Sequence, residues 1–312
     1  MEKIIIFFIG IVVLIAFILI GVFVFVPLEN PGSSNSTSGI STLRHSNSLE
    51  KGNGMVINIW IEKSDLNNLK NHRIRYLFVD IGDTGKDGKI KTSEEEIDRF
   101  IELINSYEKE NNYDFVIFPY SEVNTYDYNI NSETFRDNFI NDYADFINKG
   151  FDGIYVDIEP VKIGEEERYL SLLDEISKKF PDKIVSVYSG AVSESSFRDN
   201  EWEWTLELYK KVSDKVDLIF VPGYDSDIKT KSEYQEFIKR EVRDISSRNF
   251  NTLFLMGIPT HNPYPETIEN ALEAYNEEIA LHPNSKFIGV GIFSEWTIDD
   301  EEWKVFEERM LG

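Results

Sequence analysis

The strongest structural signal in this chain is the segment Gly150-Phe151-Asp152-Gly153-Ile154-Tyr155-Val156-Asp157-Ile158-Glu159-Pro160. Its aliphatic residues alternate with Tyr155, Asp157 and Glu159, and alternation of period two is typical of a β-strand whose two faces differ. Side chains two residues apart on one face lie roughly 6–7 Å apart. Two carboxyl groups that close, at the end of a buried strand, push their pKa values apart and leave one as a proton donor near neutral pH. A strand end that merely reaches solvent is the alternative, but it needs neither the second acid nor the tyrosine.

Strand-like apolar runs alternate with amphipathic helical segments through the rest of the chain. The predicted strands are 56–61, 75–81, 114–119, 153–159, 184–188, 217–222, 252–258 and 287–293. The predicted helices are 93–110, 134–149, 164–180, 202–214, 231–248, 265–281 and 299–310, with a shorter first crossover at 62–72. Residues 134–149 are the clearest helix, because Phe135, Phe139 and Tyr143 fall on one apolar stripe and Gly150 follows the last turn.

Strict alternation of strand and helix predicts a parallel sheet. Eight strand–helix units in about 255 residues match the size of a (β/α)8 (TIM) barrel. The predicted fold class is therefore α/β, a (β/α)8 barrel preceded by one N-terminal transmembrane helix. A doubly wound open sheet is the alternative, but no glycine-rich phosphate loop follows the first strand, as a nucleotide-binding version would need.

The composition excludes several classes of function. The chain of 312 residues has no cysteine, so disulfides and thiolate metal sites are absent from its chemistry. Its four histidines lack metal-ligand spacing, so we expect neither a metal nor a cofactor. The net charge of −24 disfavours nucleic acids and strongly anionic polymers as partners, although solubility alone is a sufficient reason for it.

The N-terminal region predicts a membrane anchor. Residues 4–27 carry no charge, a length that suits a membrane-spanning helix of about 20 residues better than the shorter apolar core of a cleaved signal peptide. Lys3 precedes this run, which places the N-terminus in the cytoplasm and the remainder outside. We therefore expect an anchor at 1–27, a flexible Ser/Asn/Gly/Pro-rich linker at 28–54, and the (β/α)8 domain at 55–312 on the outer side of the cell membrane.

Active sites of (β/α)8 barrels lie at the carboxyl ends of the strands. Those predicted ends carry Asp80, Tyr120, Glu122, Asp157, Glu159, Tyr188, Tyr224, Asp225, His261, Glu295 and Trp296. A ring of acids and aromatics suits a neutral sugar, because hydroxyls bond to carboxylates and apolar ring faces stack on aromatic side chains. The predicted partner is a polysaccharide or other glycan substrate.

Several of these motifs resemble glycoside hydrolase family 18, the chitinase-like family, over most of residues 55–310. Its fourth-strand motif Asp-Gly-x-Asp-x-Asp-x-Glu matches Asp152-Gly153-Ile154-Tyr155-Val156-Asp157-Ile158-Glu159. Gly223-Tyr224-Asp225 is similar to the end of its sixth strand, and Met256-Gly257-Ile258-Pro259 to that of its seventh. The resemblance implies a glycosidase (an O-glycosyl hydrolase).

The resemblance also implies a role for each matched residue. Glu159 would be the general acid, Asp157 would orient the 2-acetamido group of the substrate, and Tyr224 would hydrogen-bond the carbonyl of that group. The acetamido oxygen would then be the nucleophile, in substrate-assisted retaining hydrolysis. The residues expected to bind substrate are Asp225, Tyr155, Tyr120, Trp296, Phe293 and Asp80.

The chain departs from the family pattern in three places. Tyr155 replaces the middle aspartate of the fourth-strand motif, and Phe118-Pro119-Tyr120-Ser121 replaces a Ser- and Gly-rich third strand. Phe293 occupies the position of the eighth-strand tryptophan, with Trp296 three residues later. Two other functions stay open: a non-catalytic glycan-binding barrel, and a glycosidase of another family with Asp157 or Glu295 as nucleophile.

Overall fold

The computed structural model describes residues 49–193, 200–260 and 263–312. The anchor predicted over residues 4–27, and the linker up to residue 48, lie outside the described residues. Within the described part of the chain, no helix combines the length and apolar character needed to cross a membrane. The first strand begins at Asn53.

Nine parallel strands form the central sheet. They are β1 (Asn53–Asn58), β2 (Ile74–Asp80), β5 (Val116–Tyr120), β6 (Glu122–Asn124), β7 (Gly153–Glu159), β8 (Ile184–Tyr188), β11 (Leu218–Val221), β12 (Leu253–Pro259) and β13 (Phe287–Phe293). Their order is β5-β2-β1-β13-β12-β11-β8-β7-β6. The predicted strands are all present, and every pairing in this sheet is parallel.

The row of strands curls into a nearly closed barrel. Its two end strands, β5 and β6, are separated in sequence only by Ser121, so together they form one interrupted strand at the predicted third position. The backbone N–H of Asp152, just before β7, donates to the carbonyl of Ile117 in β5 at 3.0 Å, which links the two ends of the row. The architecture is that of a (β/α)8 barrel, and the open doubly wound alternative was wrong.

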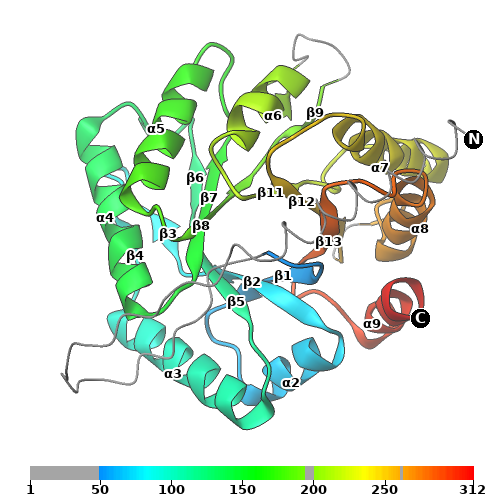
Figure 1. Cartoon of the computed structure of the whole chain (residues 1–312), viewed down its shortest axis with the longest axis horizontal. Coiled ribbons are helices and arrows are strands. Elements are labelled where there is room, and N and C mark those ends of the chain that lie inside the picture. The colour runs from blue at the N-terminus through cyan, green and yellow to red at the C-terminus, as the bar shows by residue number, and fades with distance from the viewer. Residues whose placement is uncertain (1–48, 194–199, 261–262) are drawn as a thin grey trace, which may run out of the picture. The chain divides into compact units, whose positions relative to one another are not determined.

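Helices surround the strands (Figure 1). They are α2 (Lys63–Asn71), α3 (Glu94–Asn111), α4 (Glu133–Lys149), α5 (Glu166–Lys179), α6 (Leu206–Ser213), α7 (Lys231–Ser246), α8 (Ile268–Ile279) and α9 (Asp300–Phe306), with a π-helical turn at Glu307–Leu311. Most begin where a Ser, Thr or Asp side chain accepts a backbone N–H of the first turn, as Ser132 does for α4. The first crossover, predicted to be short, forms helix α2.

Two short pairs of strands were not predicted. β3 (Asp83–Thr84) and β4 (Ile90–Lys91) form an antiparallel pair, and β9 (Ala191–Val192) pairs with β10 (Glu203–Trp204). The helix predicted at 202–214 therefore starts only at Leu206, because Glu203 and Trp204 belong to β10. These pairs lie in the loops that follow the barrel strands.

The strands separate two hydrophobic layers. The outer layer lies between strands and helices and contains Ile154, Val156 and Ile158 of β7. The barrel interior contains Phe78, Phe118, Tyr155 and Phe220 instead. Glycines make room for these rings: an added Cβ at Gly291 would lie 2.1 Å from the ring of Phe220, and one at Gly153 would lie 2.6 Å from Phe118. Large and small residues thus alternate across a filled core.

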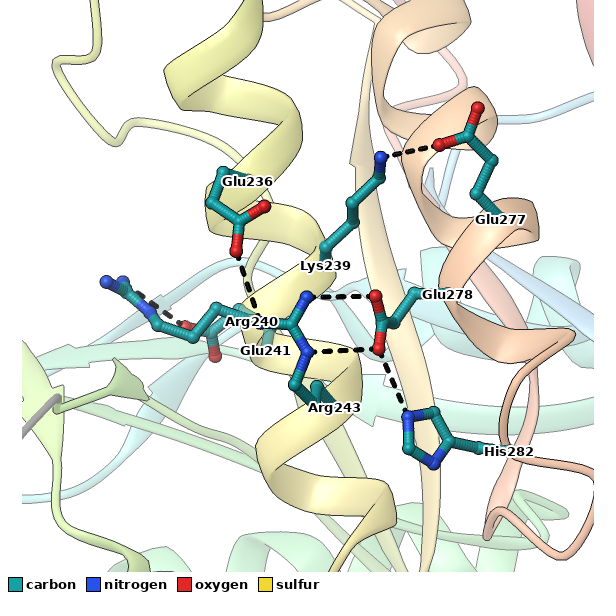
Figure 2. Close-up of polar contacts among 8 residues, drawn as sticks. All are labelled: Glu236, Lys239, Arg240, Glu241, Arg243, Glu277, Glu278 and His282. Atoms are coloured by element: carbon teal, nitrogen blue, oxygen red, sulfur yellow. Dashed lines mark hydrogen bonds and ion pairs between the residues drawn. The ribbon is translucent and has the colours of Figure 1, made fainter.

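Helices α7 and α8 are joined by charged side chains (Figure 2). The guanidinium of Arg243 on α7 donates to both carboxylate oxygens of Glu278 on α8, at 3.1 and 3.0 Å. The imidazole of His282 lies 3.1 Å from Glu278, and Arg243 also contacts Glu236 at 3.1 Å. Lys239 on α7 pairs with Glu277 on α8 at 2.5 Å. This network lies on the outer side of the barrel and is structural.

Candidate active site

Strand β7 carries the two candidate catalytic acids into the mouth of the barrel. As the alternation predicted, its aliphatic side chains pack outward, and Tyr155 lies in the barrel interior. Exposure increases along the inward face, from 2% for Tyr155 to 7% for Asp157, and Glu159 is only partly buried. Glu159 is therefore within reach of a bound substrate, and Asp157 lies one pleat deeper.

Both acids have raised pKa values. Burial, followed by the negative charge of Glu122 and then that of Asp225, raises the pKa of Glu159 to about 7. Burial, and then the charges of Glu159 and Glu122, raise the pKa of Asp157 well above its usual range. The neighbours that shift these two pKa values are all acidic. A carboxyl group with a pKa near 7 is suited to donate a proton at neutral pH.

Asp157 has an unused hydrogen-bonding atom. Its Oδ1 is buried and finds no hydrogen-bond partner among the residues that the structure describes. Buried polar atoms in native proteins are nearly always paired, so an unpaired one needs a reason.

Aromatic side chains line the mouth on both sides of the acids. The ring of Tyr120 lies edge-on to Tyr155, with centroids 5.7 Å apart. Across the barrel, Tyr224 stacks on Phe293 at 5.0 Å, and Trp296 meets the same ring edge-on at 6.0 Å. Trp296 is 47% exposed, so the structure brings it close to Phe293 despite the offset in sequence.

Tyr188, at the end of β8, is a site residue to which the sequence assigned no role. Its hydroxyl shares a hydrogen bond with that of Tyr224, and burial raises the pKa of both phenols. Tyr224 is therefore held by a neighbour on the adjacent strand, β8. The sequence did place Tyr188 at the end of a predicted strand. Its hydrogen bond to Tyr224 could not be predicted, because it depends on which strands are neighbours in the barrel.

The other predicted binding residues take different places. Asp225 follows Tyr224 with a left-handed φ of 54° and lies close enough to Glu159 to raise its pKa. Asp80 accepts a hydrogen bond from the N–H of Gly82, and its pKa is raised mainly by burial. Tyr155 is almost fully buried beneath the acids, because period two places it one pleat below Asp157. Tyr155 therefore contacts neighbouring side chains of the site, such as Tyr120, and has almost no exposed surface.

Glu295, the candidate nucleophile of the rival mechanism, lines a different cavity. That cavity of about 170 Å³ also contains Asp65, Asn68 and Trp303. Burial, and then the charge of Asp65, raise the pKa of Glu295, and Glu295 is not among the charges that shift Glu159 or Asp157. His261, also at a predicted strand end, lies outside the described residues.

The loop after β8 adds residues that the sequence did not indicate. Glu201 and Trp202 line a narrow gap together with Glu159 and Tyr188.

Within the described ranges, no group of histidine and carboxylate side chains has the arrangement of a metal site. A parallel barrel with acids and aromatics together at its mouth has the features that hydrolysis of a neutral sugar requires, although this fold also hosts other chemistry.

Comparison with known proteins gives the family. The model of "Glycosyl hydrolases family 18" matches residues 50–303, and the chain belongs to this family. No curated protein shows significant similarity to it.

Solved structures share the fold at low identity. The spore cortex-lytic enzyme SleL of Bacillus megaterium QM B1551 is 15% identical, with a TM-score of 0.58 over 84% of this chain and 75% of SleL. A chitinase from Chromobacterium violaceum ATCC 12472 is 10% identical, with a TM-score of 0.59 over 83% of this chain and 99% of the chitinase. YKL-39, solved with chitooligosaccharides, is 12% identical, with a TM-score of 0.58 over 84% and 100% of the two chains.

Proposed function

We propose that this protein hydrolyses N-acetylated glycans by substrate-assisted catalysis, with Glu159 as the general acid. The observation that carries the proposal is the pair of buried carboxyl groups on β7, whose raised pKa values come from burial and from acidic neighbours. Family membership supports the same reaction class. Relatives of this fold include chitinases, which favours a sugar with a 2-acetamido group as substrate.

Each residue has a defined role in the proposed mechanism. Glu159 protonates the leaving glycosidic oxygen, while Asp157 accepts a hydrogen bond from the acetamido N–H. Tyr224, held by Tyr188, donates its hydroxyl proton to the acetamido carbonyl oxygen. That oxygen attacks the anomeric carbon as the leaving group departs, which gives a cyclic oxazolinium ion that water then opens.

Two observations weigh against the other functions. A glycan-binding barrel without catalysis gains nothing from two buried acids, because each ionised acid lowers the stability of the fold. A protein nucleophile would be expected about 5–5.5 Å from the general acid. Glu295 lines a separate cavity, which leaves Asp157 as the only rival nucleophile among the described candidates.

Matched substrates that differ only at C2 of the sugar beside the cleaved bond test this proposal. The acetamido substrate should be cleaved, while the free-amino and hydroxyl analogues should react far more slowly, because they lack the attacking oxygen. A thiazoline mimic of the cyclic intermediate should inhibit. Equal turnover of all three substrates would exclude substrate assistance and favour Asp157 as the nucleophile.

We also propose that the protein is a single-pass membrane protein with its barrel outside the cytoplasm. The uncharged run of residues 4–27 and the polar linker after it support this location. Full-length protein should fractionate with membranes, and protease added to whole cells should release the barrel by cutting within residues 28–54. A mature protein that begins after Pro27 would refute the anchor.

A further inference from the structure

A second cavity lies beside the candidate active site, in the loops that follow β6 and β7. Its volume is about 330 Å³, and its lining includes Tyr126, Asp127, Asn129, Asn131, Lys162 and Glu165. Pockets that bind small molecules typically begin at about 300 Å³, so this cavity suits a ligand the size of one sugar ring. None of the residues assigned to catalysis lines it.

The wall of this pocket is attached directly to the backbone of the general acid. Asn124 pairs with Glu159 in the β6–β7 ladder, and the N–H of Thr125 donates to the carbonyl of Glu159 at 2.9 Å. The hydroxyl of Thr125 donates to the carbonyl of Pro160 at 2.7 Å. The pocket is therefore fixed relative to the acid, and both lie at the carboxyl ends of adjacent strands.

Tyr126 lines the pocket and is hydrogen-bonded to a residue of the gap around Glu159. Its hydroxyl donates to Oε2 of Glu201 at 2.6 Å, and Glu201 lines the narrow gap that also contains Glu159. The ammonium group of Lys162 lies 5.0 Å from the ring centroid of Tyr126 and donates to the carbonyl of Thr125 at 2.6 Å. The ring is held from two sides, yet Tyr126 is 59% exposed, as a platform for a ligand must be.

The lining indicates the chemistry of the ligand. Asn129 and Asn131 offer amide donors and acceptors, while Asp127 and Glu165 offer acceptors for hydroxyl groups. The single cation, Lys162, is outnumbered by these two carboxylates, which disfavours an anionic ligand. Besides Tyr126, the lining has only two apolar or aromatic side chains, Tyr128 and the buried Ile130, which disfavours an apolar ligand. A neutral molecule with several hydroxyl groups and one apolar face fits best.

We propose that this pocket binds one sugar unit of the glycan that Glu159 cleaves, at a position removed from the cleaved bond. The inference rests on the proposed function and extends it, because it makes the enzyme selective for longer chains. A glycan seated at Glu159 would cross the ring of Tyr126 to reach the pocket. Short substrates would leave the pocket empty and gain nothing from it.

The test measures kcat/KM of the full chain for N-acetylglucosamine oligosaccharides of increasing length. The ratio of kcat/KM between the longest and the shortest substrate should exceed one in the native protein. Tyr126→Ala should lower that ratio by about 3- to 10-fold, if stacking on a sugar is as strong as the stacking of two aromatic rings. Tyr126→Phe, which keeps the ring and loses only the bond to Glu201, should retain most of it.

Tyr264→Ala is the matched control, because Tyr264 is a 68% exposed tyrosine on the loop after β12 and does not line the pocket. It should leave the length dependence unchanged. A native ratio of one, or an equal loss for short and long substrates in Tyr126→Ala, would overturn the pocket as a subsite while hydrolysis itself stands.

If no oligosaccharide is hydrolysed, the proposed function fails, and calorimetry then decides the pocket separately. Binding of the longest oligosaccharide to the Glu159→Gln chain should weaken by a similar factor when Tyr126→Ala is added. Equal affinity with and without Tyr126→Ala would refute the pocket.

Discussion

Two of the described regions that hold buried carboxyl groups can be compared: the contact between helices α7 and α8, and the carboxyl end of β7. Burial alone would raise the pKa of Glu278 on α8, but hydrogen bonds from Arg243 and His282 outweigh burial and lower it (Figure 2). Burial raises the pKa of Glu159 and Asp157 on β7, and their acidic neighbours raise it further. Cationic side chains therefore pair with the buried acid between α7 and α8. At the barrel mouth, the groups that shift the pKa values of the two acids include no cation.

Glu241 on α7 is an intermediate case that clarifies the difference. It is fully buried, and both of its oxygens accept the N–H of Val192, at 3.1 and 2.9 Å. Burial raises the pKa of Glu241 to about 8, and the hydrogen bond only reduces the effect. A raised pKa therefore does not by itself identify a catalytic acid. The carboxyl groups on β7 differ because they lie together at the mouth, among aromatic side chains.

The largest effect is expected from Glu159→Gln, which keeps the shape of the side chain and removes the proton donor. Loss of a general acid usually lowers the rate about 100- to 10,000-fold. The measurement is kcat on an unactivated glycan, with Glu102→Gln as the control, since Glu102 is exposed on the outer helix α3 and is not among the charges that shift the pKa of Glu159. Near-native activity of Glu159→Gln would exclude Glu159 as the acid.

The same substitution should stabilise the fold at high pH. A folded pKa above the unfolded value means that stability falls as pH rises from about 4.5 to about 7. At pH 8 Glu159→Gln should therefore exceed the native protein by up to about 3 kcal/mol in free energy of unfolding, and at pH 4 the two should agree. Denaturant titration at both pH values measures this, and an equal difference at both would contradict the assigned pKa.

Arg243→Met should have the opposite sign, because it removes a cation from a buried acid. It should lower the free energy of unfolding by about 1–3 kcal/mol at neutral pH, while kcat per folded molecule stays unchanged. Lys239→Met is the matched control: it breaks the neighbouring pair with the exposed Glu277 and should cost about 1 kcal/mol or less. Equal losses from both substitutions would mean that burial of Glu278 is unimportant.

Much of the site could be predicted because its two acids lie on one strand, β7. Period two fixed the faces of β7, and parallel strands of a barrel bring their carboxyl ends together, so Tyr224 and Phe293 were expected near Glu159. The depth of Tyr155 follows from the same periodicity, which places a residue two positions below Asp157 inside the core. The role of Tyr155 in substrate binding stays a prediction.

The rest depends on contacts between distant segments. The hydrogen bond of Tyr188 to Tyr224 requires the lateral order of β8 and β11. Tyr126 and Glu201 lie 75 positions apart on irregular loops, where no periodic pattern records which side chains meet. The third strand is likewise divided at Ser121 into two parts with different partners: β5 pairs with β2, and β6 pairs with β7.

The central claim is that Glu159 is protonated near neutral pH because it is buried among acids, and the pH dependence of kcat/KM tests it most directly. This quantity reports the ionisation of the free enzyme. With an unactivated N-acetylated glycan it should fall as pH rises through about 7, the pKa of Glu159. A decline already centred near 4.5, the ordinary value for a glutamate, would contradict the account, as would a profile that stays flat to pH 9.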